Sequence, residues 1–488
     1  MILKVEDKNI KDEFGRTRIF NGINIVNKGK KDEMAIDGIS YEYGLTKSHF
    51  EILKDNGINI IRLGIIWHAI EREIGIYNTE YLNWVRSILD LCHEFEISAF
   101  LDMHQDLYSC QFGDGAPTWA TLTDGSPHTT GELWSDAYLF SDAVNNAYKN
   151  FWDNKKTEDG IGILEHYEKT WKYIIKLFGN HPAVIGYDFI NEPFPGENSL
   201  EIMGSLLMAY CSYTGKNKTP QEAMELLNNE ELKVKLLQDI DDTELYAKMA
   251  VEGKDLVAKF DEGKLADFYI RMTKTLRSIS QVGLVFTENC YFSNMGIESS
   301  LKRIEVNGEK EQLQVYAPHG YDLVVDTPLV NMSSNNRMAV ILNGHKKVQD
   351  RLNMPVLFGE WGAHYKHTEA LEHLEFIINY FDKNKWSHTY WCWFDGYEGY
   401  TSANILKRPY PMCVAGEIVN YGYDFKAKIF NLKWEANKNI KEPTLIYVEK
   451  EPKDIKYNGQ YKLIKNGINS YVIEIKNAMA TETITITL

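Results

Sequence analysis

Cysteine motifs and the short signatures of several enzyme classes are missing from this sequence. Its six cysteines form no Cys-x-x-Cys pair, so neither a cysteine zinc site nor a dithiol redox motif is supported. There is no His-Glu-x-x-His pattern, no Gly-x-x-x-x-Gly-Lys loop and no Gly-x-Ser-x-Gly turn. These absences argue against helix-borne zinc hydrolases, phosphate-loop enzymes and serine hydrolases of the nucleophile-elbow type.

Positive charge is also scarce. Lys and Arg together number 53 against 69 Asp and Glu, which gives a formal net charge of -16. An acidic chain without a basic run repels nucleic acid and gains no simple electrostatic attraction to anionic lipid. We therefore expect no nucleic-acid partner.

Long hydrophobic runs are absent as well. No window reaches the length of a transmembrane helix. Residues 1–18 alternate charged and apolar side chains, without the apolar core or the small-residue cleavage site of a signal peptide. We expect a cytoplasmic protein, or a secreted one if a targeting segment has been removed.

The composition that remains is that of a soluble globular protein. Hydrophobic residues make up 44% of the chain and charged residues 25%. A length of 488 residues exceeds one ordinary core and predicts a large domain accompanied by a smaller one.

Short apolar segments alternate with helical segments through most of the chain, which predicts a (β/α)₈ TIM barrel over residues 1–407. The structural alternative is a doubly wound open sheet. That fold usually has a glycine-rich phosphate loop after its first strand, and here Ile25-Val26-Asn27-Lys28 follows instead. The expected strands are 19–25, 58–63, 97–101, 184–190, 283–287, 312–317, 355–358 and 389–394, and the expected helices are 43–56, 81–95, 163–178, 265–279, 335–352 and 368–383.

Residues 408–488 have a different pattern, which predicts a small C-terminal antiparallel β-sandwich. Short alternating segments are separated by turn residues such as Gly459 and the pair Asn466-Gly467. The expected strands are 429–434, 444–448, 461–464, 471–475 and 483–488.

Two segments within the barrel are too long to be simple loops, at about 121–160 and 197–263. Both follow predicted strands, and loops after strands lie on the active face of a barrel. They are therefore candidate walls or a lid over the site. The second is polar and helical in pattern, so a solvated helical decoration is the alternative.

Two glutamates stand where predicted strands end. Glu192 ends the fourth strand, and Glu360 follows the seventh within Phe-Gly-Glu-Trp-Gly. A lone Glu192 would equally suit a helix cap or a surface loop, but a barrel brings both strand ends to one mouth. Two carboxyl groups meeting on one substrate are the equipment of glycoside hydrolysis, in which one protonates the leaving oxygen and the other attacks the anomeric carbon.

Polar residues at the other strand ends fit the same chemistry. Arg62 would keep Glu360 ionised, and Tyr321 would donate a hydrogen bond to the same carboxylate. His104 and His319 are expected to line the site as neutral donors, although a lone His104 would more simply be a core histidine. Further candidates for substrate binding are Asp102, Asp106, Asn191, which would bind the sugar 2-OH, and Trp391, which would form the floor; Glu288 and Asp395 are weaker candidates, as hydrogen-bond partners.

The sequence resembles the endoglycoceramidases of glycoside hydrolase family 5. The resemblance extends from about Asn21 to the C-terminal sandwich. It rests on Asp102-Met103-His104-Gln105-Asp106-Leu107-Tyr108-Ser109, Gly113-Asp114-Gly115-Ala116-Pro117, Ile190-Asn191-Glu192-Pro193, Ala317-Pro318-His319, Phe358-Gly359-Glu360-Trp361-Gly362, Arg408-Pro409-Tyr410-Pro411 and Val414-Ala415-Gly416.

The resemblance implies cleavage of the β-glycosidic bond between a glycan and ceramide, with retention of configuration. It implies Glu192 as acid/base and Glu360 as nucleophile, and an apolar cleft for lipid beside a polar glycan slot. Contacts to the first sugar are implied for His104, Asp106, Asn191 and Trp391, with Lys28 as a further contact. The substrate would be a glycosphingolipid or related β-glycoside, met in transient contact with a micelle or membrane surface.

No metal and no organic cofactor is implied, because an acid and a nucleophile suffice for this reaction. The alternatives are an exo-acting β-glucosidase on glucosylceramide or steryl glucoside, an endo-β-glucanase, or a non-catalytic glycolipid-binding protein. We hypothesise that the segment 197–263 narrows the glycan side of the site or caps its lipid side.

Overall fold

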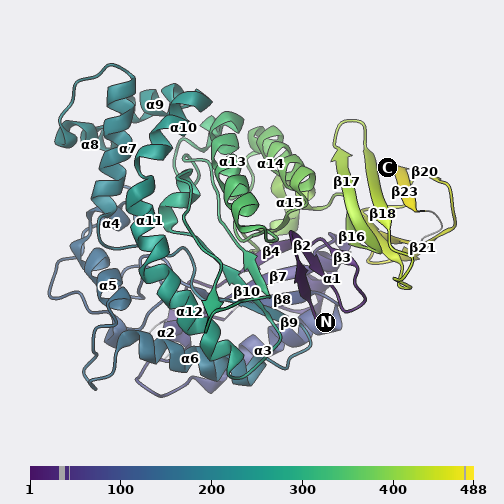
Figure 1. Ribbon diagram of the computed structural model, residues 1–488, viewed down its shortest axis with the longest axis horizontal. Coiled ribbons are helices and arrows are strands. Elements are labelled where there is room, and N and C mark those ends of the chain that lie inside the picture. The colour runs from purple at the N-terminus through teal and green to yellow at the C-terminus, as the bar shows by residue number, and fades with distance from the viewer. Residues whose placement is uncertain (32–38, 43, 477–479) are drawn as a thin grey trace.

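Eight parallel strands form the centre of the protein, whose computed structural model describes residues 1–31, 39–42, 44–476 and 480–488 (Figure 1). They are hydrogen-bonded in the order β13-β10-β9-β8-β7-β4-β15-β14. Parallel bridges from Tyr316 to Val356 and from His319 to Glu360 join the two outermost strands, so the sheet curves round on itself as the predicted TIM barrel. The strands are β4 (Asn21–Ile25), β7 (Ile60–Ile66), β8 (Ser98–His104), β9 (Val184–Asp188), β10 (Leu284–Thr287), β13 (Gln314–Tyr316), β14 (Leu357–Phe358) and β15 (Ser387–Tyr390).

Each expected barrel strand overlaps one of these, and the largest shift is in the last. The strand expected at 389–394 is β15, which begins at Ser387 and ends at Tyr390. Ser387 and His388 are polar but fully enclosed, and they pair with β14 and β4. Enclosure on both faces of a parallel sheet thus overrides their weak strand propensity.

Amphipathic helices surround the barrel. In α6 (Ile163–Phe178) the buried side chains recur every three or four residues, because one face of the helix packs on the sheet. The helix expected at 43–56 begins only at Lys47, and residue 43 lies outside the described residues. The other barrel helices are α1 (Lys47–Asp55), α2 (Trp67–Ile70), α3 (Thr79–Glu94), α12 (Lys264–Arg277), α13 (Asn335–Leu352), α14 (Leu371–Asn384) and α15 (Thr401–Leu406).

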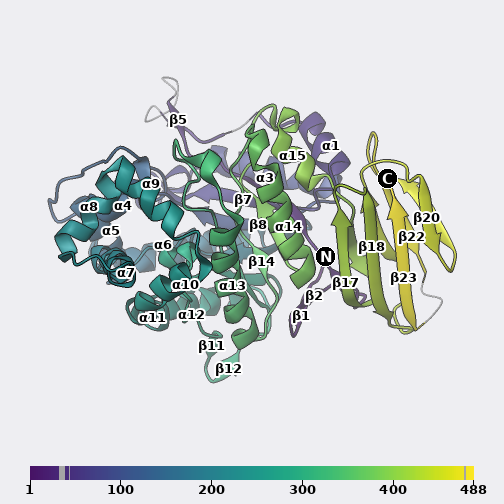
Figure 2. The same ribbon diagram turned by 90° about the horizontal axis from the view of Figure 1, so that it is seen from above.

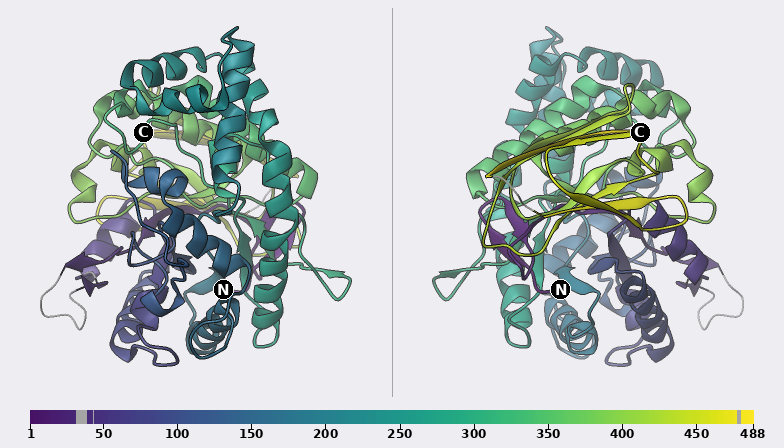
Figure 3. Two further views of the ribbon diagram at one scale, coloured as in Figure 1. Left: turned by 90° about the vertical axis from the view of Figure 1, so that its left-hand side faces the viewer. Right: turned by 90° about the vertical axis from the view of Figure 1, so that its right-hand side faces the viewer.

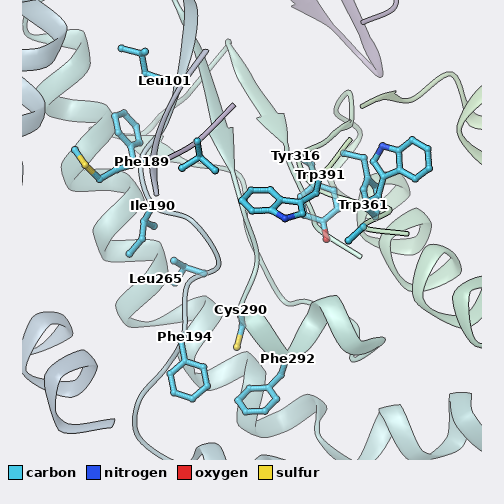
Figure 4. Packing of buried hydrophobic residues seen from close by; sticks show 14 of the residues in the cluster. Leu101, Phe189, Ile190, Phe194, Leu265, Cys290, Phe292, Tyr316, Trp361 and Trp391 are labelled. Atoms are coloured by element: carbon cyan, nitrogen blue, oxygen red, sulfur yellow. The ribbon is translucent and has the colours of Figure 1, made fainter. Parts of the chain in front are cut away.

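The main hydrophobic core lies between these helices and the strands. Figure 4 shows part of it, with Leu101 of β8, Leu265 of α12 and Trp361 after β14 among the buried side chains. A second cluster fills the bottom of the barrel and includes Leu3 and Ile10. Among the helices of the described residues, none has both the length and the apolar character that a membrane crossing requires.

The two long insertions are helical, as the pattern of the second one predicted. The second forms a group of five helices at one end of the molecule, opposite the C-terminal strands (Figures 1 and 2). These helices pack mainly on one another and on α12 and α13. The first insertion contains α4 (Ala137–Phe140) and α5 (Asp142–Trp152), and the second contains α7 (Ser199–Tyr213), α8 (Pro220–Asn228), α9 (Glu230–Asp239), α10 (Thr243–Glu252) and α11 (Lys254–Glu262).

The C-terminal residues form the predicted antiparallel sandwich, seen facing the viewer in the right-hand panel of Figure 3. Its two sheets have the strand orders β1-β2-β3-β16-β19-β22-β21 and β17-β18-β23-β20. The first sheet therefore includes strands from the N-terminus, which the sequence analysis did not predict, and β16, β17 and β20 were also missed. The strands are β1 (Lys4–Glu6), β2 (Asn9–Lys11), β3 (Thr17–Arg18), β16 (Tyr410–Val414), β17 (Gly416–Asp424), β18 (Ile429–Ala436), β19 (Thr444–Val448), β20 (Asp454–Tyr457), β21 (Tyr461–Lys465), β22 (Tyr471–Ile475) and β23 (Thr481–Thr487).

Candidate active site

A cavity of about 310 Å³ opens where the barrel strands end. Glu192 and Glu360 both line it, and Trp391 and Tyr321 stand beside them. Ligand atoms of Glu192, His319 and Glu360 all lie within 4.8 Å of one another, so the two carboxylates are close enough to act on one bond. The strand ends therefore bring together the pair that the sequence placed far apart.

Glu360 is held by two donors. Arg62 Nη1 lies 2.6 Å from Oε1, and the Tyr321 hydroxyl donates to Oε2 at 2.8 Å. The side chain is 6% exposed, so these charge-assisted bonds act in a site largely without water. The carboxylate is thus fixed in one orientation, with the contacts that the sequence analysis expected.

Arg62 is the centre of a buried polar cluster. It projects from β7 with no exposed surface, and its guanidinium forms an ion pair with several carboxylates. Burial alone would lower the pKa of Arg62, but the surrounding carboxylates outweigh it and raise that pKa well above the ordinary value. Its partners, besides Glu360, are Asp102 (3.0 Å), Asp188 (3.0 Å), Glu288 (2.9 Å), the side-chain oxygen Oδ1 of Asn191 (3.0 Å) and the side-chain oxygen Oδ1 of Asn24 (3.2 Å).

Glu192 occupies a different environment. Its backbone is left-handed, with φ of 42°, and its N–H donates to Glu288 Oε2 at 2.9 Å. Its carboxylate Oε1 lies 3.1 Å from His319 Nδ1 and 3.3 Å from Asn294 Nδ2. Burial raises the pKa of Glu192, the charge of Glu360 raises it further, and His319 opposes both. A carboxyl whose pKa is raised suits a general acid.

The two histidines carry positive charge, which corrects the expectation that they are neutral donors. For His319, burial lowers the pKa, but Glu288 and Glu360 raise it well above the ordinary value. For His104, burial is likewise outweighed by Asp102 and Asp106, which raise the pKa to about 10. Neutral histidines were expected because the number of nearby carboxylates cannot be counted from strand ends alone.

Lys28, Asp106 and Trp391 form one wall of the cavity. Lys28 forms an ion pair with Asp106, and its Nζ lies 4.6 Å from the centre of the Trp391 ring. The Trp391 ring stacks on His104, with centroids 5.2 Å apart and planes at 16°. A flat ring beside polar groups is the kind of surface on which a sugar rests.

Three residues predicted to bind substrate are engaged in other contacts. Asp102 is fully buried, pairs with Arg62 and lies 2.9 Å from His104 Nδ1, so it supports the wall from behind. His319 is fully buried too and touches Glu192 instead of lining the cavity. Asn191 does line the cavity; its side-chain Oδ1 accepts from Arg62, and its side-chain Nδ2 donates to the Gln105 backbone carbonyl at 3.0 Å.

Some participants were missed or underrated. Glu288 accepts hydrogen bonds from Arg62 and from the backbone N–H of Glu192. It is therefore a more central member of the site than the weaker candidate that the sequence analysis named. The sequence analysis did not name Asp188 as a site residue. Its position as a charged residue within a predicted buried strand could have indicated such a role. Asn294 lies in a short 3₁₀ turn with no motif around it. Asp395 is exposed and does not line the cavity.

Apolar side chains, some of them from the two insertions, line part of the cavity. Met203 of α7 and Leu227 of α8 share it with Phe292 and Met295, which follow β10 (Figure 4 shows Phe292). From the first insertion, Trp134, Leu139 and Phe140 complete this region. The lining of the site is therefore mixed, with the charged groups around Glu192 and Glu360, apolar side chains of both insertions, and further charged side chains such as Asp136 and Lys233.

Within the part of the chain that the structure describes, carboxylates and histidines gather in three groups whose ligand atoms lie within 4.8 Å of one another: His104, Asp106 and Asp114; Glu192, His319 and Glu360; and Asp102, Asp188 and Glu288. Each group is already in contact with a cationic side chain. Lys28 pairs with Asp106, His319 carries its own charge, and Arg62 pairs with the third group.

Comparison with protein families gives two matches. The family model described as cellulase (glycosyl hydrolase family 5) matches residues 26–396. The model of the glycoside hydrolase family 5 C-terminal domain matches residues 408–487. Together the two matches cover the barrel and most of the sandwich.

Individual proteins point in the same direction. The chain is 31% identical over 215 residues to an endoglycoceramidase of Cyanea nozakii, which is 39% of this chain and 41% of that protein. It is 22% identical over 267 residues to a glucosylceramidase of Rhizopus delemar, covering 44% of this chain and 39% of that protein. The chain thus matches about two fifths of the length of these curated relatives. The structure of endo-glycoceramidase II from Rhodococcus sp. in complex with ganglioside GM3 shares the fold, with a TM-score of 0.72, 22% identity and 99% of each chain covered.

Proposed function

The chain belongs to glycoside hydrolase family 5, and on this premise we propose that it is a retaining β-glycosidase that releases the glycan of glycosphingolipids from ceramide. In this proposal Glu360 is the nucleophile and Glu192 is the acid/base. The observation that carries it is the meeting of these two carboxylates at one cavity, each with different partners.

The first step forms a covalent bond between Glu360 and the sugar. A carboxylate oxygen of Glu360 attacks the anomeric carbon while Glu192 gives its proton to the glycosidic oxygen, and the lipid leaves as an alcohol. Glu192 becomes an anion in this step, and the positive charge of His319 at 3.1 Å stabilises that anion.

The second step restores the enzyme. Glu192, now a base, takes a proton from a water molecule, which attacks the anomeric carbon and displaces Glu360. Two inversions give net retention. The separation of Glu192 and Glu360, whose ligand atoms lie within 4.8 Å of one another, supports this route. A retaining enzyme needs its carboxyl groups only about 5–5.5 Å apart, whereas an inverting one needs about 6.5–9.5 Å.

The choice of a glycolipid rests on the mixed lining of the cavity. Trp391, Lys28 and Asp106 provide a polar platform for a sugar, and the apolar side chains of the lining suit a lipid aglycone. The insertion helices α7 and α8 contribute Met203 and Leu227 to the apolar part. This supports the hypothesis that the insertion covers the lipid side of the site.

The test is product analysis with intact substrates in detergent micelles, comparing a ganglioside, a gala-series glycolipid and glucosylceramide. We expect intact oligosaccharide and ceramide from the first two. Free glucose from glucosylceramide alone would instead favour an exo-acting glucosidase, and products from soluble glucan would favour an endoglucanase.

Substitution of the two carboxylates tests their roles. Glu192→Gln and Glu360→Gln keep the size of each side chain but remove the proton donor or the nucleophile, so turnover should fall by several orders of magnitude, as measured on a fluorogenic lactoside. Binding of glycolipid with near-normal turnover in both variants would contradict the assignment and favour a non-catalytic binding protein.

A further inference from the structure

A line of four side chains leads from the outer helices of the barrel to the carboxylate of Glu192. It begins at His345 of α13 and passes through Tyr316, Asn289 and Asn294, each hydrogen-bonded to the next. All four are buried, with exposed fractions of 7% or less. None of these four side chains has a role in the reaction proposed above. The line meets that chemistry only where Asn294 contacts the carboxylate of Glu192.

One backbone contact fixes the direction of the hydrogen bonds. Asn289 Nδ2 lies 2.9 Å from the carbonyl oxygen of Cys290, which can only accept, so this amide atom is the nitrogen. The same nitrogen donates to Asn294 Oδ1 at 2.7 Å, and Asn289 Oδ1 accepts from the Tyr316 hydroxyl at 2.8 Å. Asn294 must therefore turn its own nitrogen toward Glu192.

The far end of the line is neutral. Because the Tyr316 hydroxyl uses its only proton toward Asn289, its oxygen accepts from His345 Nδ1 at 2.8 Å. Burial lowers the pKa of His345 to about 3, so this ring stays uncharged over the range in which enzymes of this kind are assayed. The line thus presents a fixed donor, and not a titrating charge, to Glu192.

Glu192 Oε1 receives two donors, Asn294 Nδ2 at 3.3 Å and His319 Nδ1 at 3.1 Å. An oxygen that accepts two N–H bonds has little capacity to carry a hydroxyl proton as well. We propose that Asn294 is a positioning residue that reserves Oε1 of Glu192 as an acceptor and so keeps the transferable proton on Oε2. This inference rests on the proposed role of Glu192 as general acid.

Removing the amide donor of Asn294 should shift the pKa of Glu192 in a predictable direction. A hydrogen bond donated to a carboxylate favours the charged form, so removing Asn294 should raise the pKa of Glu192. The other titratable groups around Glu192 would remain in each variant; they are His319, Glu288, Glu360 and Asp106, with the hydroxyls of Tyr138, Tyr148, Tyr291 and Tyr321. A shift in the pH profile therefore reports the missing donor.

The experiment uses Asn294→Leu, which keeps the shape of the side chain and removes the amide. The alkaline limb of the pH profile of kcat/KM should move to higher pH by about one unit. A shift of this size corresponds to the free energy of one hydrogen bond to a charged group. Turnover of an alkyl glycoside, which needs protonation of its leaving group, should fall by about tenfold. Turnover of a dinitrophenyl glycoside, which leaves without a proton, should change little.

Two further variants separate this role from a structural one. Tyr316→Phe removes the hydroxyl that orients Asn289, so the limb should move in the same direction by a smaller amount. Tyr423→Phe is the matched control, because this buried sandwich tyrosine has a hydroxyl without a hydrogen-bond partner within the described ranges. Its pH profile should be that of the unmodified enzyme.

The inference is overturned if Asn294→Leu and Tyr316→Phe leave the pH limb and the ratio of alkyl to dinitrophenyl turnover unchanged, or lower both rates equally. Glu192→Gln is measured in parallel. Selective loss of the alkyl substrate in Glu192→Gln but not in Asn294→Leu would refute only the role of Asn294. An equal fall in kcat/KM for both substrates in Glu192→Gln would refute the acid role of Glu192 itself, because kcat/KM reports the first step, in which only the alkyl leaving group needs a proton.

Discussion

Individual side chains give Glu360 a strongly positive environment. Around Glu360, the cations Arg62 and His319 are in direct reach of the carboxylate, at 2.6 and 3.6 Å. Asp188, next to Arg62, has its pKa raised well above the ordinary value, first by burial and then by Glu288. Asp188 and Glu360 both contact Arg62, so they share the positive field of one guanidinium.

His104 provides a pH prediction at this scale. Its pKa is raised to about 10, against about 6.5 when unfolded, so it contributes stability that is fully present below pH 6.5 and is lost as the pH rises through 10. The difference in unfolding free energy between the unmodified protein and His104→Gln should therefore shrink from pH 6 to pH 10. Urea unfolding at a series of pH values measures it, and a constant difference would contradict the protonated state.

Sequence reasoning found the residues whose type and position at a strand end already suggest chemistry. Glu192, Glu360, Arg62 and Tyr321 meet as expected because a barrel brings all strand ends to one face. The charge of His104 could not be predicted, because it depends on how many carboxylates surround a buried ring. Asn294 was out of reach for a different reason, since its role depends on a line of contacts from three separate segments.

Among the elements, the insertion helices contact the barrel at several places, one of them through Arg337. Arg337 of α13 donates to the Leu237 carbonyl at the end of α9 (3.0 Å) and to the Met332 carbonyl (2.6 Å). It also forms an ion pair with Asp322, which is 2% exposed. One guanidinium thus fixes both α9 and the loop between β13 and α13, and both border the cavity.

Replacement of this residue tests whether that junction shapes the lipid side. Arg337→Met should raise KM for a glycosphingolipid several-fold and leave kcat on a small aryl glycoside nearly unchanged, because only the lipid side of the cavity is loosened. Stability should fall by about 3–5 kcal/mol, since Asp322 would be left buried and unpaired. Steady-state kinetics and urea unfolding measure the two effects.

Arg351→Met is the matched control. Arg351 lies on the same helix and also donates to two backbone carbonyls, those of Leu301 and Ser299, but it does not border the cavity. Its KM for glycolipid should stay normal. A rise in KM equal to that of Arg337→Met would mean that general loosening of α13, and not the link to α9, is responsible.

Elements with strong periodicity were predicted well, and those shaped by their partners were not. The helices α6 and α13 have the predicted bounds, because their apolar faces are long and regular. The strands β16 and β17 were missed, although β17 alternates buried and exposed residues through part of its length. The short strands β1 to β3 have too few residues for any pattern and depend on pairing with β16.

For the molecule as a whole, the joint between barrel and sandwich is polar and buried. Arg408 forms an ion pair with Asp382 of α14 and also bonds the Asn21 side-chain oxygen at 3.1 Å. The hydroxyls of Tyr410 and Tyr447 donate to the carbonyls of Gly57 and Asp55, at 2.7 and 2.6 Å. These contacts join β16 and β19 to the bottom of the barrel, so the two parts should unfold together.

Breaking the ion pair tests that coupling. Arg408→Met leaves Asp382 buried without its partner, and stability should fall by about 3–5 kcal/mol. The double variant Arg408→Met with Asp382→Leu should recover most of the loss, because no unpaired charge remains. Calorimetry measures both changes in stability. If the unmodified protein unfolds in one transition and Arg408→Met unfolds in two, this joint holds the barrel and the sandwich in one cooperative unit.

The pairing of β3 with β16 has a consequence for how the protein is made. Thr17 bonds the Gly416 carbonyl across 399 positions of the chain. A ribosome adding about 5–20 residues per second needs about 20–80 s to cover this interval. During that time the N-terminal strands have emerged but their neighbour in the sheet does not yet exist. Translation of this protein therefore includes a long interval in which strand edges are open to wrong partners, and it ends only when the sandwich is synthesised.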